Sequence, residues 1–196
     1  MAFSVTSFKT NLAKGGGGAR PSLYKVDINA PSGVGSFSTN SNLLVKAAAI
    51  PASNIAPLTT NFMGRAYKLA GFRTFDNWSV TVINDENMEA RQTIMEWMVR
   101  SAGMLKGNRS SIYGAFVDSG GNRRNESNAV VTQMGTDGSE VQKWNIFNMW
   151  PTELGEIALD WSSDALEEYT VSFCYDYWSH GTVSDSEYVS RNPHTA

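Results

Sequence analysis

The sequence has a single cysteine, two histidines and no long apolar run. One cysteine excludes an intramolecular disulfide framework and a cysteine-rich zinc site. The two histidines, His180 and His194, leave little for metal binding or acid–base catalysis near neutral pH. No apolar stretch approaches the roughly 18 residues of a membrane span, and the N-terminus lacks the charged start and apolar stretch of a secretion signal. We therefore expect a soluble protein that is not secreted, has no membrane contact and binds no cofactor.

The sequence does contain enough apolar material for one core. Its 196 residues are 41% hydrophobic, 18% charged and 11% aromatic, which is typical of one globular domain, with or without arms. A chain of this length buries roughly two-thirds or more of its unfolded surface, so its core needs no disulfide. The formal net charge of −3 argues against a protein that grips nucleic acid, because neutralising phosphates takes clustered Lys and Arg.

The small net charge hides an uneven distribution along the chain. Residues 1–82 carry eight basic residues and two acids, residues 83–150 are nearly balanced, and residues 151–196 carry nine acids and one base. The net charges of the three parts are +6, −1 and −8. Two interpretations stay open. The charges belong to solvated faces of a monomer, or they mark surfaces that meet between identical subunits or repel an anion.

Residues 1–20 are polar and include four consecutive glycines, Gly15–Gly18, which predict a flexible N-terminal arm. A phosphate-binding loop is disfavoured, because no strand precedes the glycines and no Gly-Lys-Ser or Gly-Lys-Thr follows them. Residues 52–62 combine small polar residues with the nearby Pro51 and Pro57, and they predict a long loop. Long loops in compact domains usually carry function, so this one is a candidate contact segment.

Alternation of apolar and polar residues predicts several short strands separated by turn-forming residues. We expect them at residues 24–28, 42–49, 78–83, 129–134, 141–149, 157–161 and 169–178. Only one helix is predicted, over about residues 85–102, where Asn84 or Asp85 is placed to cap it and Ala90, Ile94 and Trp97 recur at helical spacing.

These elements predict a mainly β fold: an antiparallel β-sandwich or barrel with one flanking α-helix, an extended loop and terminal arms. The corresponding division of the chain is a flexible N-terminal arm at residues 1–20, a β domain at residues 21–178 and a polar C-terminal tail at residues 179–196.

The sequence offers little catalytic chemistry. A pair of carboxylates could cleave a glycosidic bond, but the acids of the C-terminal third follow turn residues, where a solvated charge is the usual state; they are Glu153, Glu156, Asp160, Asp164, Glu167 and Glu168. Cys174 lies inside a strand pattern and is expected to be packed, not reactive. Six tryptophans would suit stacking on sugars or bases, but Trp78, Trp97 and Trp144 fall on apolar positions and are expected in the core. We therefore expect no enzyme, and no catalytic, cofactor or metal residue.

One stretch is more specific than any short motif. It is Ala70–Asp85, which reads AGFRTFDNWSVTVIND and follows Phe62-Met63-Gly64-Arg65. Further distinctive segments follow along the chain, at Ala90-Arg91-Gln92, Trp97, Trp150-Pro151-Thr152, Gly155-Glu156, Leu159-Asp160-Trp161 and Asp176-Tyr177-Trp178. Together and in this order, they resemble the tail tube protein family of contractile-tailed bacteriophages. The Gly15–Gly18 run and the tail from Ser179 onward depart from the family pattern.

The resemblance implies a structural virion protein that forms stacked hexameric rings of a tail tube. In such tubes, strands of neighbouring subunits join around the channel, which removes exposed sheet edges. The implied partners are other copies of the chain, the tail sheath protein, a baseplate or hub initiator, the tape measure protein inside the channel, and double-stranded DNA in transit. The implied location is the virion tail, after assembly in the host cytoplasm.

Two hypotheses follow about individual residues. The loop and the N-terminal arm are candidates for contacts between rings, with Ser53, Asn54, Ile55, Pro57 and Leu58 as the contact residues. The channel should be acidic or neutral, because Lys or Arg would bind the phosphates of passing DNA. Asp176 is the candidate channel-facing acid, since it is expected on the polar side of the strand at residues 169–178.

Two other functions compete with this one. The first is the tube protein of a related contractile machine, either a secretion system or a bacteriocin particle. The second is a β-sandwich carbohydrate-binding module, which only the aromatic content supports.

Overall fold

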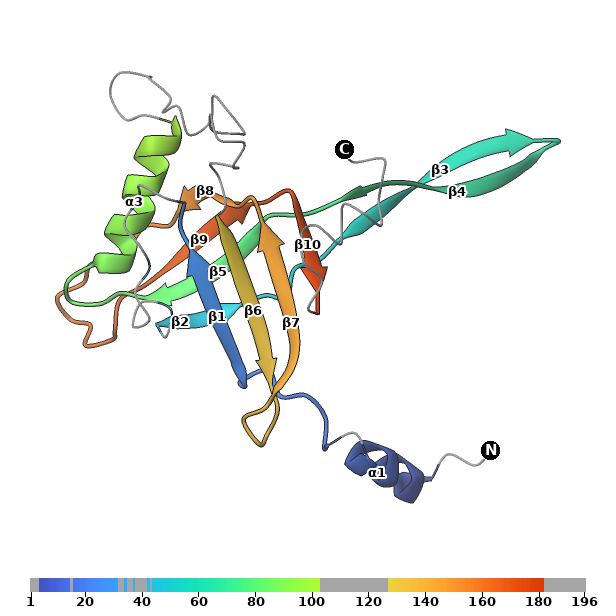
Figure 1. Cartoon of the computed structure of the whole chain (residues 1–196), viewed down its shortest axis with the longest axis horizontal. Helices are drawn as coiled ribbons and strands as arrows, with labels where there is room; N and C mark the ends of the chain where they lie inside the picture. The colour runs from blue at the N-terminus through green and yellow to red at the C-terminus, as the bar shows by residue number, and fades with distance from the viewer. Residues whose placement is uncertain are drawn as a thin grey trace, which may run out of the picture.

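The computed structural model describes residues 4–102, apart from 15, 32, 33, 35, 36, 38–41 and 43, together with residues 127–181. Figure 1 shows how its helices and strands are arranged. In chain order they are α1 (Val5–Lys14), β1 (Tyr24–Asn29), β2 (Val45–Ala48), β3 (Asn54–Phe62), β4 (Arg65–Thr74), β5 (Trp78–Ile83), α3 (Glu89–Ala102), β6 (Asn128–Met134), β7 (Glu140–Phe147), β8 (Trp150–Leu154), β9 (Glu168–Cys174) and β10 (Tyr177–His180).

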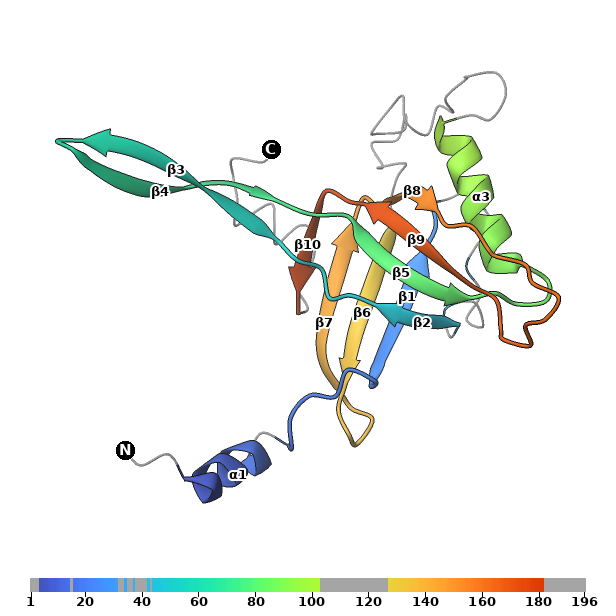
Figure 2. The ribbon, with the colours of Figure 1, turned by 180° about the vertical axis from the view of Figure 1, so that it is seen from behind.

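Two four-stranded antiparallel sheets form the body of the protein. The first sheet has the strand order β1-β6-β7-β10, and the second has the order β2-β5-β9-β8. One buried cluster contains residues of both sheets, so the sheets pack face to face as a sandwich. Strands β3 and β4 pair only with each other and extend away from the body as a long hairpin (Figures 1 and 2).

The core follows from the alternation within the central strands of the second sheet. In β5, Trp78 and Val80 are buried while Ser79 between them is exposed. Val80 is paired with Val171 of β9, and Trp78 is paired with Phe173. The rings of Trp78 and Phe173 lie 5.8 Å apart. Side chains on every second position therefore point into the sandwich, as the sequence pattern predicts.

Helix α3 packs beside the sandwich and contributes to its core. Ala90, Ile94 and Trp97 are each at most 2% exposed. The ring of Trp97 lies 5.9 Å from that of Phe173, which joins the helix to β9. The helix begins at Glu89, whose backbone N–H donates to Asp85 Oδ2 at 3.4 Å. The helix expected at residues 85–102 is confirmed, with a start four residues later.

Two of the expected strands are wrong in detail. Residues 157–161 form no strand; the strand lies earlier, at β8 (Trp150–Leu154), although this segment contains Pro151. Proline lacks an N–H but is tolerated in β8, because β8 is an edge strand. The single strand expected at residues 169–178 is two strands, β9 and β10, which belong to different sheets. The bend between them contains Asp176.

The N-terminal residues also differ from expectation, since residues 5–14 form helix α1 where no helix was predicted. The mainly β, antiparallel fold is confirmed, and the described strands form open sheets and not a closed barrel. Residues 103–126 and most of the C-terminal tail expected at residues 179–196 lie outside the described residues. Within the described part of the chain, no helix is long and apolar enough to span a membrane.

Candidate assembly surfaces

The segment expected to be a long loop is the first strand of the β3–β4 hairpin. Every residue of both strands is exposed. The strands are joined at Met63 and Gly64, whose φ angles are +49° and +77°. Positive φ at both central residues is typical of the tight type I′ turn that matches the twist of a hairpin. The prediction of a loop was wrong because Pro57 and the small polar residues of β3 carry no strand alternation.

The hairpin tolerates Pro57 because the pairing of its strands is irregular there. The register shifts between Ile55 and Pro57. Opposite this bulge, a Cβ atom on Gly71 would lie 2.5 Å from the carbonyl oxygen of Ala56. Only glycine allows so close an approach of the two backbones, so Gly71 and Pro57 together fix the shape of the bulge.

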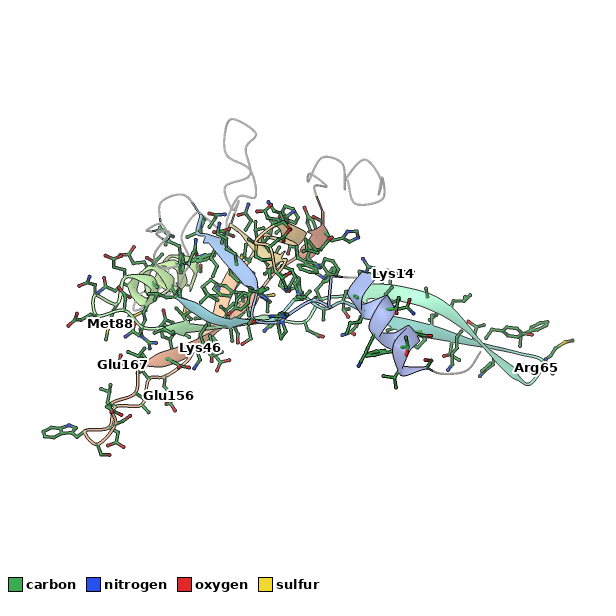
Figure 3. The ribbon with its side chains drawn as sticks, turned by 90° about the horizontal axis from the view of Figure 1, so that it is seen from below. Lys14, Lys46, Arg65, Met88, Glu156 and Glu167 are labelled. Atoms are coloured by element: carbon green, nitrogen blue, oxygen red, sulfur yellow. The ribbon has the colours of Figure 1, made fainter. Side chains whose placement is uncertain are left out.

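The surface of the hairpin is apolar and basic. It contains three basic residues and no acid across residues 54–74, namely Arg65, Lys68 and Arg73. Figure 3 shows Arg65 at the far end of the hairpin. Its exposed large apolar side chains are Ile55, Leu58, Phe62, Met63, Tyr67, Leu69 and Phe72, of which Phe72 is 91% exposed. A two-stranded ribbon is marginally stable by itself, and so much exposed apolar surface indicates a protein contact.

The base of the hairpin is fixed to the sandwich by hydrogen bonds. The carbonyl oxygen of Ala52 accepts from Trp178 Nε1 at 3.1 Å and from the Tyr175 hydroxyl at 3.3 Å. Asn54 Nδ2 donates to Asp76 Oδ2 at 2.8 Å, which links the start of β3 to the chain just after β4. Burial raises the pKa of Tyr175, with a smaller contribution from the charge of Asp76, so its hydroxyl keeps the proton that it donates. The direction in which the hairpin leaves the body is therefore defined.

The five predicted ring contacts fall at the beginning of this hairpin. Asn54, Ile55, Pro57 and Leu58 lie in β3 and are exposed, while Ser53 precedes the strand and is half-buried. Sequence reasoning missed the second strand, which adds Tyr67, Leu69 and Phe72 to the same ribbon. The end of this strand lies in the distinctive stretch at residues 70–85, but that stretch was not interpreted as part of a paired strand.

The opposite end of the molecule carries an acidic segment between β8 and β9. Residues 156–167 include four acids and no base. Figure 3 shows Glu156 and Glu167 at the end of the molecule opposite Arg65. Three large apolar side chains of the segment are exposed, Leu159, Leu166 and the fully exposed Trp161. Asp160 accepts hydrogen bonds from Ser162, from its N–H at 2.9 Å and from its hydroxyl at 2.8 Å, which lower the Asp160 pKa.

This acidic segment leaves the sandwich at a tightly built point. The N–H of Gly155 donates to the carbonyl oxygen of Thr170 at 2.7 Å, and a Cβ at Gly155 would lie 2.8 Å from that same oxygen. Arg91 of α3 donates to the Gly155 carbonyl at 3.1 Å, and its guanidinium lies 5.0 Å from the centre of the Tyr169 ring. Burial raises the pKa of Tyr169 to about 12, and the nearby Arg91 charge opposes that shift.

The outer face of the second sheet is polar and mostly uncharged. Ser79 is paired with Ser172, and Thr81 with Thr170, so two rows of hydroxyls cross this face. At one side, Lys46 forms an ion pair with Glu168. Asp176 follows β9 at the end of this face; it is exposed, and its carboxylate accepts from Asn148 Nδ2 at 2.8 Å. The sequence had suggested that Asp176 lies within a strand. In the structure it lies in a bend between two strands.

The structure shows where the side chains considered for chemistry lie. No group of three or more His, Cys, Asp or Glu side chains among them is placed to hold a metal ion. Cys174 is a free, half-buried thiol in β9, and His180 is exposed at the end of β10. Trp78 and Trp97 are core residues, as expected, and Trp144 packs against the core.

A closed core, an exposed apolar hairpin and oppositely charged ends define a structural subunit that assembles with other chains. The comparisons with known proteins agree. The family model described as phage tail tube protein matches residues 19–181. The chain belongs to this phage tail tube family.

Two curated relatives are similar over most of the chain. The tail tube protein gp19 of Enterobacteria phage T4 is 34% identical over 171 residues, which cover 86% of this chain and 96% of that protein. The tail tube protein gp19 of Enterobacteria phage T6 is 35% identical over the same coverage.

Solved structures of contractile injection systems share the fold. A chain of the anti-feeding prophage baseplate superposes with a TM-score of 0.61 at 11% identity, over 84% of this chain and 95% of that one. A chain of the anti-feeding prophage cap gives 0.59 at 15% identity, over 85% and 92%. A chain of an extracellular contractile injection system, in a sheath–tube complex in the extended state, gives 0.52 at 11% identity, over 93% and 100%.

Proposed function

We propose that this chain is the subunit of stacked hexameric rings that form a phage tail tube, the conduit for genome DNA inside a contractile sheath. The observation that carries the proposal is the fully exposed apolar hairpin in a chain of the tail tube family. A monomer gains nothing from a ribbon with no buried residue, whereas a ring of copies can bury it between subunits.

The proposal includes a set of partners and a location. The subunit contacts other copies of itself, the sheath protein outside, the baseplate or hub that starts the tube, and the tape measure protein inside. Double-stranded DNA passes through without specific binding. The tube is part of the virion tail and assembles in the host cytoplasm. It performs no covalent chemistry.

We assign the contact between rings to the hairpin, beginning at Ser53, Asn54, Ile55, Pro57 and Leu58. Exposed Ile55 and Leu58 supply apolar area on β3, and Phe72 supplies it on β4. The hydrogen bonds to Ala52 hold the base of the ribbon, so the contact is presented at a fixed angle. Preorganisation of this kind lowers the entropy cost of association.

We assign the channel lining to the hydroxyl-bearing outer face of the second sheet, with Asp176 at its end. Its paired serines and threonines offer no phosphate-binding charge, and Lys46, the one cation within the four described strands of this sheet, is already paired with Glu168. A surface of this kind lets DNA slide, because each unpaired Lys or Arg would add a phosphate contact.

Electron microscopy of the purified full-length chain tests the assembly. We expect rings and tubes of one diameter. The matched variant replaces Pro57–Ala70 with a two-residue Asn-Gly turn, which keeps the base of the hairpin with Ile55 and Phe72 and removes the other five exposed large apolar side chains. This variant should give a folded monomer or single rings, without tubes. Normal long tubes from the variant would remove the hairpin from the contact.

Genome delivery tests the channel. Thr170→Lys, on the outer face of β9, and Asp176→Lys should slow DNA release from assembled particles while tubes still form. Thr170→Ser and Asp176→Asn are the matched controls, since they add no cation. Unchanged delivery with both lysine variants would contradict the assigned lining.

The two competing functions predict other results. A tube protein of a related injection machine would give tubes that do not enclose DNA in the particle. The solved injection systems share only the fold with this chain, so their likeness does not favour this function over a phage tube. A carbohydrate-binding module would stay monomeric and bind glycans in a binding screen.

A further inference from the structure

Helix α1 is an amphipathic helix that no other described part of its own chain covers. It has no buried residue. Val5, Phe8 and Leu12 follow helical spacing and are all exposed, so they form one apolar stripe. The helix also lies outside residues 19–181, the part of the chain that the family model matches. Its role is therefore not explained by the sandwich or the hairpin.

The ends of α1 are formed by specific hydrogen bonds. At its start, Ser4 Oγ accepts from the N–H of Thr6 at 3.2 Å. At its end, Gly16 donates to the Ala13 carbonyl and Gly17 donates to the Leu12 carbonyl, at 3.1 and 2.9 Å. Gly16 has a φ of +70°, and this arrangement is a Schellman motif. An isolated helix of ten residues is marginal in water, so these caps support a helix whose remaining stability must come from a partner.

The acidic segment, residues 156–167, complements this helix in charge and in apolar surface. Helix α1 carries Lys9 and Lys14 and no acid, while the segment carries four acids and no base. The segment also exposes Leu159, Trp161 and Leu166, which match the three apolar side chains of the helix in number. The β3–β4 hairpin is a poorer acceptor for α1, because residues 54–74 are basic and would repel Lys9.

We propose that α1 of one copy docks on the acidic segment of a neighbouring copy. This inference rests on the proposed assembly into rings and adds a second contact to that of the hairpin. The two surfaces lie at opposite ends of the chain: in Figure 3, Lys14 lies toward the hairpin side of the body and Glu156 at the other end. A contact between two different surfaces is heterologous, and repeated around an axis it closes a ring.

Two structural details make the docking feasible. The tether is residues 15–19, four of which are glycine, because the carbonyls of Arg20 and Leu23 already accept hydrogen bonds from Gln133 of β6. Its extended length is at most about 20 Å, which lets α1 reach beyond the sandwich. The acceptor is not a loose loop, because Gly155, Arg91 and Thr170 fix the point where it leaves the sandwich. The helix is thus joined to the body by a glycine-rich tether, while the receiving surface is held by the sandwich.

Crosslinking between two different single-cysteine chains tests the docking. Both chains carry Cys174→Ser, one adds Phe8→Cys and the other adds Leu159→Cys or Leu166→Cys. They are mixed, assembled and treated with a short bismaleimide. We expect heterodimers that join the two chains, at a yield on the order of tenfold above the control, because effective concentration at a docked contact far exceeds that of chance encounters.

The matched control is Thr10→Cys, which lies on the opposite side of α1 from the apolar stripe. Equal yields from Phe8→Cys and Thr10→Cys with both acceptor positions would overturn the proposal. A second experiment places Phe8→Cys and Leu159→Cys in the same chain and dilutes it with chains that carry no cysteine. Crosslinks that form only within one chain would also overturn the proposal, because α1 would then cover its own acidic segment.

Microscopy of the same samples separates this inference from the proposed function. Tubes that assemble without the specific crosslink overturn the docking of α1 and leave the tube assignment intact. Cysteine-free Cys174→Ser chains that form no tubes at all argue against the tube assignment itself. As an independent readout, Lys9→Glu should lower the crosslink yield several-fold and Asp160→Lys in the acceptor chain should restore it. Failure of both effects contradicts the charge complementarity.

Discussion

The sandwich and the hairpin are both antiparallel β structure, yet they differ in what surrounds their side chains. In the sandwich strand β5, buried and exposed positions alternate, and Trp78 and Val80 lie in the core. In β3 and β4 every residue is exposed, although Phe72 and Leu69 are as apolar as core residues. The sandwich is therefore stabilised within one chain. The hairpin carries apolar surface that only another chain can cover.

The sharpest way to test this difference is to remove one large apolar side chain from each region. Phe173→Ala in β9 empties a site that is 1% exposed and touches Trp78 and Trp97. We expect it to lower the free energy of unfolding by about 3–5 kcal/mol. Phe72→Ala in β4, at 91% exposure, should change it by less than about 0.5 kcal/mol. Denaturant unfolding of the monomeric form measures both, and equal losses would contradict the comparison.

The sequence predicted the first region well and the second poorly, for a physical reason. Burial on one face imposes a period of two, so β1, β5, β6 and β9 could be located from residues such as Val26, Trp78 and Val131. The hairpin is exposed on both faces, so no alternation marks it, and Pro57 indicated a loop. Helix α1 was missed likewise, because the four glycines after it suggested only a flexible arm.

The candidate site shows the same division. The residues at the start of the hairpin were named from the expected loop, but their partners on β4 come from pairing that composition does not reveal. Asp176 was placed on the polar side of a strand, whereas the chain bends there and changes sheet. Where a strand crosses from one sheet to the other depends on long-range packing, for which the local sequence carries no signal.

A second, smaller effect is expected at the point where the acidic segment leaves the sandwich. Gly155→Ala puts a Cβ 2.8 Å from the Thr170 carbonyl oxygen, so β8 and β9 must separate. We expect a loss of about 1–3 kcal/mol in the free energy of unfolding. Gly138→Ala is a useful control, because its Cβ would meet no atom within 4 Å and only its positive φ is strained. Thermal unfolding of the two variants gives the comparison; an equal loss in both would show that the contact with Thr170 is not the cause.

The buried phenol of Tyr169 gives the stability of the sandwich a dependence on pH at high pH. Its pKa is raised to about 12, mainly by burial, so the folded state favours the protonated form. The resulting stability is fully present below pH 10, the ordinary tyrosine value, and is lost as the pH rises from about 10 to about 12. Between pH 9 and pH 11.5 the loss should be about 2 kcal/mol, because one pKa unit corresponds to about 1.4 kcal/mol.

Unfolding free energies measured at pH 9 and pH 11.5 check this effect. Tyr169→Phe should remove the larger part of the dependence over that range, whereas Tyr175→Phe, at a second tyrosine whose pKa is raised by burial, should remove a smaller part. A dependence that persists fully in Tyr169→Phe would assign it to another group.

The smallest effect on stability is expected where the effect on assembly is large. Leu58→Ser in β3 removes an apolar side chain that is 59% exposed. The free energy of unfolding of the monomer should stay within about 0.5 kcal/mol of the parent chain. Sedimentation at increasing concentration should nevertheless show a higher threshold for tube formation. Asn61→Ser on the same strand is the matched polar control, and an equal shift in both variants would mean that the apolar contact is not responsible.

Hydrogen exchange tests the central claim most directly. Amides of β3 and β4 and of the sandwich strands are compared in the monomer and in assembled tubes, with the exposed ribbon expected to exchange fast in the monomer. The account predicts that the tube slows exchange in β3 and β4 by orders of magnitude and leaves β5 and β9 slow in both forms. Hairpin amides that exchange equally fast in monomer and tube would contradict a hairpin covered by neighbouring subunits.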